Sequence, residues 1–568
     1  MYAWPARPRH AEYRGPLKQM KNMTIEPQHA PQAGDPEIAV QQASGPRQGA
    51  RETWVEVPSR NGAIAAWCYT DRRSYLPNET VHLHVSSNCD RVGLKIYRDG
   101  ANRLLMHQTG VRAAGFHPAP DGAYEYGCDW PVFAQWTLPA DTPSGACIVE
   151  VVDANGAPLG HHVFIVRARH KREHALVLVA ATSTWAAYND WGGANHYFGI
   201  HPGTPRGRAP ILSARRPWAR GQAWLPSDAP RSINTRRPGR AGPARYEFIE
   251  WAAAHGFSKY YALAGWASYE RLFLIWAEEH GYAVDIITQD DLHHDPEALS
   301  DYRCAVFVGH DEYWSREMRD HVDAFVEGGG NVARFAGNFM WQVRLEAGGT
   351  RQVAYKYDAR ALDPFATAKP ALMTSAWEDP LINHPGASTF GVNGLRGIYA
   401  GFGGMARRGP RGFSVFRPEH WAFSGTGLCY ADMFGDSVNI FGYEVDGLDY
   451  TFVDGRPEPL GTDGAPQGLE ILAMGWATLS ETGRAEDAYS FMLGERDARF
   501  RATLLETAAT AENVQRHSRG SGMIVHFKKG RGQVFTAATC EWVYGLSRGD
   551  GTTETITNNV LKRFIGSD

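Results

Sequence analysis

Alternation of apolar and polar residues is the dominant pattern between Thr53 and about Arg167. Segments such as TVHLHVSS, RVGLKIYR and ACIVEVV carry this alternation, and turn residues separate them at intervals of about 8–12 residues. Such short, evenly spaced strands predict an immunoglobulin-like (Ig-like) β-sandwich over residues 52–168. The Cys-Trp-Cys signature of antibody domains is missing, so the pattern predicts an architecture and no chemistry.

The pattern changes after Lys171, where continuous apolar runs alternate with amphipathic segments. Uninterrupted apolar runs are typical of parallel strands buried on both faces, and the amphipathic segments predict helices between them. This order predicts a largely parallel sheet with helices on both faces, within an α/β domain over residues 169–568. The predicted strands are Ala175–Ala180, Ala283–Thr288, Cys304–Val308 and Asn331–Gly337, and a helix is predicted over Tyr269–His280.

One further predicted helix has signals at both ends. Ser315 is well placed as its N-cap, Glu317 lies in the first turn, and the glycines Gly328–Gly330 end it. The stretch 363–519 is harder to interpret, although Val438–Gly447 predicts a strand within it. We interpret this stretch as an elaboration of the same α/β domain. The segment MIVHFKKGRGQVFTAAT near the end predicts a pair of strands, followed by a closing helix.

Composition narrows the range of functions. The 58 basic residues against 62 acidic ones, with no clustered Lys/Arg stripe, argue against nucleic acid as a partner. No run approaches the ~20 apolar residues of a membrane helix. The seven cysteines have no CxxC spacing and are odd in number, which argues against a disulfide framework and a thiolate metal site and favours the cytoplasm. Residues 1–51, rich in Pro, Gln, Arg and Gly, predict a mobile tail or an arm for a partner.

Two polar stretches carry most of the candidate chemistry. WAAYNDWGGANHYFG (185–199) and VFVGHDEYWS (306–315) both follow predicted parallel strands. Open α/β folds place their ligands at the carboxyl edge of the sheet, so both stretches are expected in one pocket. They bring Tyr188, Tyr197, Asp311 and Glu312, with His310 nearby, which is a set that suits a hard metal ion better than a covalent nucleophile.

Each of these residues also has a simpler interpretation. Tyr188 and Tyr197 are predicted in a Gly-rich loop. Their phenols are either ligands of a strongly Lewis-acidic ion, such as ferric iron, or aromatic rings that pack over the pocket. Glu312 is a ligand or an ion-paired loop carboxylate. His310 lies two residues earlier and has three possible roles. It binds the metal, it orients water or polarises a substrate carbonyl, or it is simply a hydrogen-bonded histidine.

Two other segments add polar groups at strand ends. Asn338 directly follows the strand NVARFAG and can donate to a substrate carbonyl oxygen or cap a turn. Glu444 follows VNIF and can act as a general base through water, with Asp446 as a rival in the same turn. After the strand at Cys304 the chain has Gly309-His310-Asp311-Glu312, with no thiol or hydroxyl, which argues against covalent catalysis. No P-loop or GxGxxG motif supports a nucleotide cofactor.

At these residues the chain resembles the large (beta) subunit family of N,N-dimethylformamidase. The resemblance runs from about Trp54 to the end, through SYLPNETVHL, AYN, GYAVDIITQDDLH, GHDEYWS, GGNVARFAGN, GYEVDG and GRGQVFTAATCEWVYGL. It implies a glutamine-amidotransferase-like core that carries one mononuclear iron, held by two tyrosines and one glutamate. The implied activity is hydrolysis of a formamide to an amine and formate.

Transferred to this sequence, the resemblance implies Tyr188, Tyr197 and Glu312 as ligands of one Fe(III) per chain. It implies supporting roles for His310 and Asn338, and Glu444 as the general base that activates water. The family enzyme has a longer segment between its two tyrosines, a separate small subunit and an extra N-terminal domain. A small amide substrate, a homo-oligomer and a small helper subunit are the partners considered. Two alternatives stay open: a zinc or manganese hydrolase on the same scaffold, and a non-catalytic ligand-binding relative.

Overall fold

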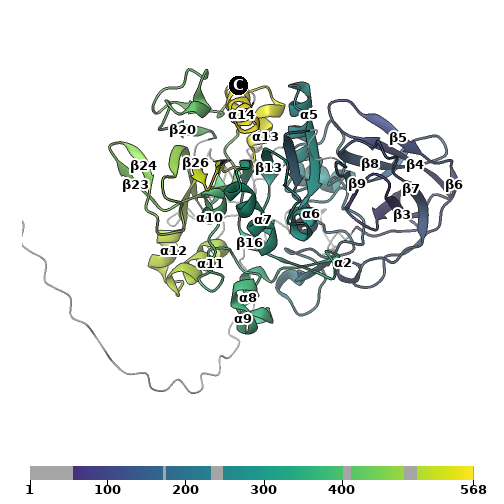
Figure 1. Cartoon of the computed structure of the whole chain (residues 1–568). Coiled ribbons are helices and arrows are strands. Elements are labelled where there is room, and N and C mark those ends of the chain that lie inside the picture. Colours follow the sequence, from purple (N-terminus) through teal and green to yellow (C-terminus); the bar gives the residue numbers. More distant parts are fainter. Residues whose placement is uncertain (1–55, 170–173, 232–246, 401–410, 479–494, 567–568) are drawn as a thin grey trace, which may run out of the picture.

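The computed structural model describes residues 56–169, 174–231, 247–400, 411–478 and 495–566. A β-rich unit occupies one end of the molecule, and a mixed sheet with helices occupies the rest (Figure 1). The predicted N-terminal tail, residues 1–51, lies outside the described residues. No described helix is both long and apolar enough to cross a membrane.

The β-rich unit consists of two sheets that enclose a shared core. The first contains β1 (Ala66–Thr70), β3 (Thr80–Ser87) and β7 (Val132–Thr137); the second contains β2 (Ser74–Tyr75), β9 (Pro158–Val166), β8 (Gly145–Val152), β4 (Arg91–Arg98), β5 (Leu104–Gln108) and the short β6 (Arg112–Ala113). Leu83 and Val85 of the first sheet pack with Leu94, Ile96 and Val149 of the second. The alternating residues therefore form a sandwich of strands, and its Ig-like topology stays a prediction.

A nine-stranded sheet forms the centre of the molecule. Its strands are, in order, β12 (Val284–Thr288), β10 (Leu176–Ala180), β13 (Cys304–His310), β15 (Asn331–Gly337), β27 (Gly532–Ala537), β26 (Arg519–Lys529), β25 (Glu470–Thr478), β20 (Phe413–Val415) and β21 (Met433–Phe434). The pairs from β12 to β27 are parallel, and those from β27 to β21 are antiparallel. The four strands predicted between 175 and 337 are confirmed, but the prediction of a largely parallel sheet is wrong for half of it. Strands from the stretch 363–519 and the C-terminal hairpin add the antiparallel half.

Helices cover both faces of this sheet, as the strand–helix order predicts. In β10, Leu176 and Leu178 face one apolar cluster together with Phe273 of α5 (Glu270–Glu279). Val177 and Val179 face the other cluster, with helix α7 (Arg316–Glu327). Helices α6 (Gln289–His294), α13 (Trp542–Ser547) and α14 (Gly551–Ile565) also contact strands of the parallel half. A strand buried on both faces accounts for the continuous apolar run in its sequence.

Helix α7 confirms the capping prediction. The Ser315 hydroxyl accepts a hydrogen bond from the Met318 backbone N–H, and the helix ends at Glu327, immediately before Gly328. The side-chain oxygen satisfies one of the backbone donors that the first turn of a helix leaves without a partner.

Several smaller elements surround the sheet. The β19 (Asn393–Ala400)–β22 (Tyr443–Gly447) ladder is antiparallel, and β14 (Tyr313–Trp314) pairs in parallel with β16 (Trp341–Gln342). The strand predicted over Val438–Gly447 therefore begins only at Tyr443. Other elements are α2 (Ala123–Tyr126), α3 (Thr182–Tyr188), β11 (Ile211–Ser213), α4 (Glu247–His255), β17 (Arg344–Glu346), β18 (Arg351–Val353), α8 (Ala359–Leu362), α9 (Phe365–Ala368), α10 (Ala387–Phe390), β23 (Tyr450–Val453), β24 (Arg456–Pro459), α11 (Glu495–Glu506) and α12 (Ala511–His517).

Strands β8 and β9 of the sandwich contact β12, the edge strand of the central sheet. Arg98 forms an ion pair with Glu278 of α5 at 2.8 Å, and the Ser144 hydroxyl accepts a hydrogen bond from the Ile286 N–H at 2.9 Å. The sandwich contains none of the candidate site residues named from the sequence. It can affect them only by supporting the edge of the sheet that it contacts.

Candidate active site

The candidate residues converge although up to 256 positions separate them in the sequence. Glu312 lies two residues beyond β13, Asn338 directly follows β15, and Tyr188 ends α3, which follows β10. These three strands are neighbours in the parallel half of the sheet, so their carboxyl ends meet at one edge. Glu444 reaches the same place from β22, outside the sheet. Tyr188 belongs to a helix and not to a loop, which corrects one detail of the sequence interpretation.

The Glu312 carboxylate is the centre of this cluster. Its oxygens accept hydrogen bonds from the hydroxyl of Tyr188 at 2.9 Å and from that of Tyr197 at 2.6 and 2.8 Å. The Trp341 indole N–H donates to it at 2.6 Å, and the Tyr313 hydroxyl donates to that of Tyr197 at 2.8 Å. Glu312 is only 2% exposed, so these donors replace the water that an ionised carboxylate would otherwise bind.

His310 connects Glu312 with the second carboxylate of the cluster. Its Nε2 lies 3.3 Å from Glu312 and 3.0 Å from Glu444, and its Nδ1 lies 2.7 Å from the Leu263 carbonyl oxygen. Because a carbonyl only accepts, Nδ1 carries a proton, and Nε2 carries one when it bonds to the carboxylates. Burial alone would lower the pKa of His310, but the charge of Glu444 and the hydrogen bonds to both carboxylates raise it to about 10.

The acidic side chains of the cluster differ in their tendency to ionise. Burial opposes the ionisation of Glu312, yet the hydrogen bond from His310 and the charge of Lys356 hold its pKa below the usual value. Burial raises the pKa of Glu444, an effect that His310 reduces. Burial and the charge of Glu312 raise the pKa of Tyr188 and of Tyr197 well above 10. Both phenols are therefore neutral donors unless a cation replaces their protons.

Asn338 completes the group of predicted residues. Its backbone has φ of +64°, a left-handed conformation that Asn tolerates better than most residues and that turns the chain directly after β15. Its Nδ2 lies 3.4 Å from His310 Nε2, and its Oδ1 has no hydrogen-bond partner among the described residues although it is buried. The amide oxygen is therefore available to a donor group of a small polar molecule.

Sequence reasoning missed three contributors to the cluster. Trp341 and Tyr313 come from the short pair β14–β16, and the Lys356 ammonium lies 3.4 Å from the centre of the Tyr197 ring. Neither two-residue strand has a detectable hydrophobic period, and Lys356 lies far from any predicted strand end. The aromatic run EYWS after Glu312 was the one available signal for Tyr313.

Asp311 and Asp446 do not belong to this cluster. The Arg334 guanidinium donates to both Asp311 oxygens at 2.6 and 2.8 Å and to Asp446 at 2.9 Å. The other Asp446 oxygen accepts from the Phe339 N–H at 3.0 Å. Asp446 is therefore held in a buried ion pair, which removes it as the rival of Glu444, and the expectation that Asp311 joins the pocket is wrong.

Among the histidine, cysteine and carboxylate side chains of the described residues, two groups have ligand atoms close enough together to hold a metal ion. His310, Glu444 and Cys540 are all buried and place one ligand atom each within 4.8 Å of the others. Cys540 was not foreseen as a site residue. Burial, together with the charge of Glu444, raises the pKa of its thiol well above the usual value, so the thiol is protonated in the metal-free protein.

The second group consists of His420, Glu470 and His526, on the antiparallel half of the sheet. One tautomer assignment satisfies both rings without a cation. The Ala422 N–H donates to His420 Nδ1, His420 Nε2–H donates to His526 Nδ1, and His526 Nε2–H donates to Gln533, each at 3.2 Å. Burial lowers the pKa of His420 to about 3, which agrees with neutral rings. We therefore assign this group a structural role.

Comparison with known proteins places the chain in a family. No curated protein matches it. Among solved structures it is similar to Spo0M, a sporulation control protein from Bacillus subtilis, with 18% identity over 19% of this chain and 51% of that chain. The TM-score is 0.14, too low to support any argument. The family model "N,N-dimethylformamidase beta subunit-like, C-terminal" matches residues 92–558. Because this match covers most of the sequence, the chain belongs to the N,N-dimethylformamidase beta subunit-like family.

Proposed function

We propose that the chain hydrolyses the C–N bond of a small linear amide, such as an N-substituted formamide, and that it binds one ferric iron through Tyr188, Tyr197 and Glu312. One observation carries this proposal: two phenol oxygens from one segment converge on the same buried carboxylate, within 2.9 Å of it. Membership of a dimethylformamidase-like family supports the reaction class.

The donor set suits a hard, highly charged ion. All three proposed ligand groups offer oxygen, and together they carry three negative charges once both phenols lose their protons. Each phenol proton now lies between its own oxygen and Glu312, the place from which a cation would displace it. When bound, iron would supply Lewis acidity towards the amide carbonyl.

The other residues of the cluster would handle protons and orient the substrate. Glu444 would take a proton from the attacking water through the oxygen that faces His310, and His310 would hold that carboxylate in place. The water oxygen then bonds to the carbonyl carbon, the C–N bond breaks, and Glu444 returns the proton to the leaving nitrogen. Asn338 would hydrogen-bond the substrate through its unpartnered amide oxygen or its N–H.

A second candidate keeps the pocket and changes the ion. His310, Glu444 and Cys540 form a nitrogen, oxygen and sulfur set that suits zinc better than ferric iron. Under this alternative Glu444 is a ligand and Tyr188 and Tyr197 only line the pocket. A homo-oligomer and a small helper subunit remain predictions from the family resemblance.

Metal analysis with a visible spectrum separates the two candidates. We expect about one iron per chain and a coloured protein, because phenolate bound to ferric iron absorbs visible light by charge transfer. Tyr197→Phe should shift or abolish this band. Tyr260→Phe should leave it unchanged, because the Tyr260 ring packs on Tyr188 and Tyr197, with ring centres 5.9 and 6.3 Å apart, and Tyr260 is not a proposed ligand. A colourless protein with stoichiometric zinc would favour the second candidate, and a metal-free protein would favour a non-catalytic relative.

A further inference from the structure

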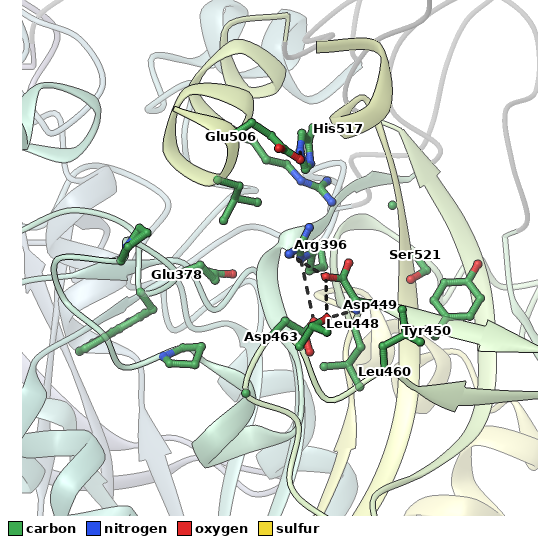
Figure 2. Close-up of a pocket in the computed structure, with 18 of the residues that line it drawn as sticks. Glu378, Arg396, Leu448, Asp449, Tyr450, Leu460, Asp463, Glu506, His517 and Ser521 are labelled. Carbon is green, nitrogen blue, oxygen red and sulfur yellow. Dashed lines mark hydrogen bonds and ion pairs between the residues drawn. The ribbon is translucent and has the colours of Figure 1, made fainter. Parts of the chain in front are cut away.

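A second pocket opens in the antiparallel half of the molecule. It has a volume of about 970 Å³, within the range of small-molecule sites, and its walls come from β19, α11, α12 and the loops around β23. None of the six candidate active-site residues lines it. Figure 2 shows Leu448, Leu460 and Tyr450 beside the charged group of Arg396, Asp449 and Asp463. The pocket thus has apolar and charged side chains next to one another.

Arg501 of α11 lies on the wall of this pocket and is a buried cation that forms no ion pair within the part of the chain that the structure describes. It is only 4% exposed, and its guanidinium forms no ion pair with a described residue, although the charges of Asp449 and Glu378 act on it from a longer distance. Its one hydrogen bond goes to the Arg519 carbonyl at a long 3.4 Å, and its Nε has no partner in the described parts of the chain. Removing a charge from water without a partner costs several kcal/mol, so this arrangement is unfavourable by itself.

The neighbouring Arg396 shows the contrast. It pairs with Asp449 at 2.8 Å, whereas Arg501 has no such pair among the described residues. Burial, followed by repulsion from Arg396, lowers the pKa of Arg501 to about 9, so it still carries its charge at neutral pH. Two acceptors on the pocket wall, Glu378 Oε2 and Asp463 Oδ1, and the Ser521 hydroxyl also lack partners among the described residues.

We propose that this pocket binds a small organic oxyanion, a carboxylate or a phosphate ester, whose charged head pairs with Arg501. The planar guanidinium presents paired N–H donors that match both kinds of oxyanion. The side chains of Leu448, Leu460 and Tyr450 would contact the body of the same molecule. The neutral amide substrate of the proposed reaction lacks the negative charge that Arg501 would bind. The oxyanion is therefore a different molecule from the amide, and its binding does not depend on the proposed amide hydrolysis.

Binding of simple anions to the intact chain tests the proposal. Inorganic phosphate and butyrate are titrated at constant ionic strength, with isothermal titration calorimetry and thermal unfolding as readouts. We expect at least one of them to bind and to raise Tm, and Arg501→Met to weaken that binding at least tenfold. Arg499→Met, an exposed position on the same helix that does not line the pocket, should bind as the wild type does. The response to phosphate or to butyrate identifies which oxyanion is preferred.

The stability of the ligand-free variant separates a binding role from a structural one. Because Met removes an uncompensated buried charge, Arg501→Met should unfold at the same or a higher temperature than the wild type. Leu460→Glu adds a negative charge at a position that is 53% exposed, so it should fold normally and weaken binding of the same anion several-fold. The proposal is overturned if neither anion binds the wild type, or if either Arg501→Met or Leu460→Glu binds as tightly as the wild type.

Discussion

Two buried clusters, Asp311–Arg334–Asp446 and Glu312–His310–Glu444, take their carboxylates from neighbouring positions of the same two segments. Each places one basic side chain between two carboxylates. They differ in the cation. Arg334 keeps its proton at any ordinary pH, and although burial opposes its charge, the two aspartates raise its pKa further. His310 has a proton that it can lose, and the carboxylates around it have other donors.

The clusters also differ in how completely their polar atoms are satisfied. In the Arg334 cluster both aspartates accept hydrogen bonds from the guanidinium, and the remaining Asp446 oxygen accepts one from the Phe339 backbone N–H. In the His310 cluster, Asn338 Oδ1 has no hydrogen-bond partner among the described residues, and Glu444 Oε2 contacts the titratable ring of His310 at 3.0 Å. A saturated ion pair fixes structure, whereas unsatisfied buried atoms next to a titratable group leave room for chemistry.

The largest effect should follow from Arg334→Met. This variant leaves two carboxylates buried without their cation, and breaking a buried pair costs about 3–5 kcal/mol. We expect a large drop in the midpoint of thermal or urea unfolding, or little folded protein. Arg303→Met, at an exposed arginine just before β13, should change stability by less than about 0.5 kcal/mol. Equal stability of the two variants would remove the structural role of the Arg334 cluster.

Glu312→Gln should affect metal content and leave the fold intact. Glutamine keeps the shape and still accepts from Tyr188 and Tyr197, but it removes the anionic ligand. Iron per chain should fall at least ~10-fold and the visible band should disappear, while the circular dichroism spectrum stays that of the wild type. Glu317→Gln, exposed on α7, is the control. Full iron content in Glu312→Gln would contradict the proposed ligand set.

Glu444→Gln should separate binding from turnover. If Glu444 is the general base, the variant keeps iron and colour and loses about 10²–10⁴-fold in kcat/KM on an N-substituted formamide. Asp446→Asn should instead lower the unfolding midpoint, because it weakens the pair with Arg334. Retained activity in Glu444→Gln would disprove the assignment, and loss of metal would favour the His310–Glu444–Cys540 set.

The smallest effect concerns Glu541, a buried carboxyl whose two oxygens have no hydrogen-bond partner among the described residues. Burial raises its pKa from 4.5 to about 8. The folded protein therefore holds this proton more tightly than the unfolded chain does. Protonated Glu541 contributes its full share to the free energy of unfolding below about pH 4.5, and this contribution is lost as the pH rises towards 8. Glu541→Gln should weaken the decline of Tm between about pH 5.5 and 8.5 by a few degrees. Exposed Glu512→Gln should leave that decline unchanged, and an unchanged slope in both variants would rule out the effect.

The sequence was most informative where one local signal decides the structure. The continuous apolar runs of β10, β13 and β15 and the Ser315 cap predicted those elements to within two residues. Convergence of Tyr188, Glu312 and Asn338 followed from the rule that parallel strands share a carboxyl edge. Tyr197 also reaches this edge, through the turn that Gly192 and Gly193 make at positive φ.

The antiparallel half of the sheet could not be predicted in the same way. Strands β20, β21 and β25 lie between 413 and 478, and β26 joins them from beyond position 518, so their pairing depends on contacts distant in sequence. Asp311 and Glu312 illustrate the same limit at the site. They are adjacent and chemically alike, and only the position of Arg334 on β15 decides which carboxylate is neutralised.

The hydrogen bond from Ile286 to Ser144 has a consequence for self-association. Strand β12 is the last strand of the central sheet, and an edge strand offers its free backbone groups as a template to any other chain. Here the sandwich covers that edge, and the Ser144 hydroxyl accepts a hydrogen bond from one of its outward N–H groups, that of Ile286. The sandwich therefore protects the end of the sheet from strand-to-strand aggregation, a task that requires its position and not any reactive group of its own.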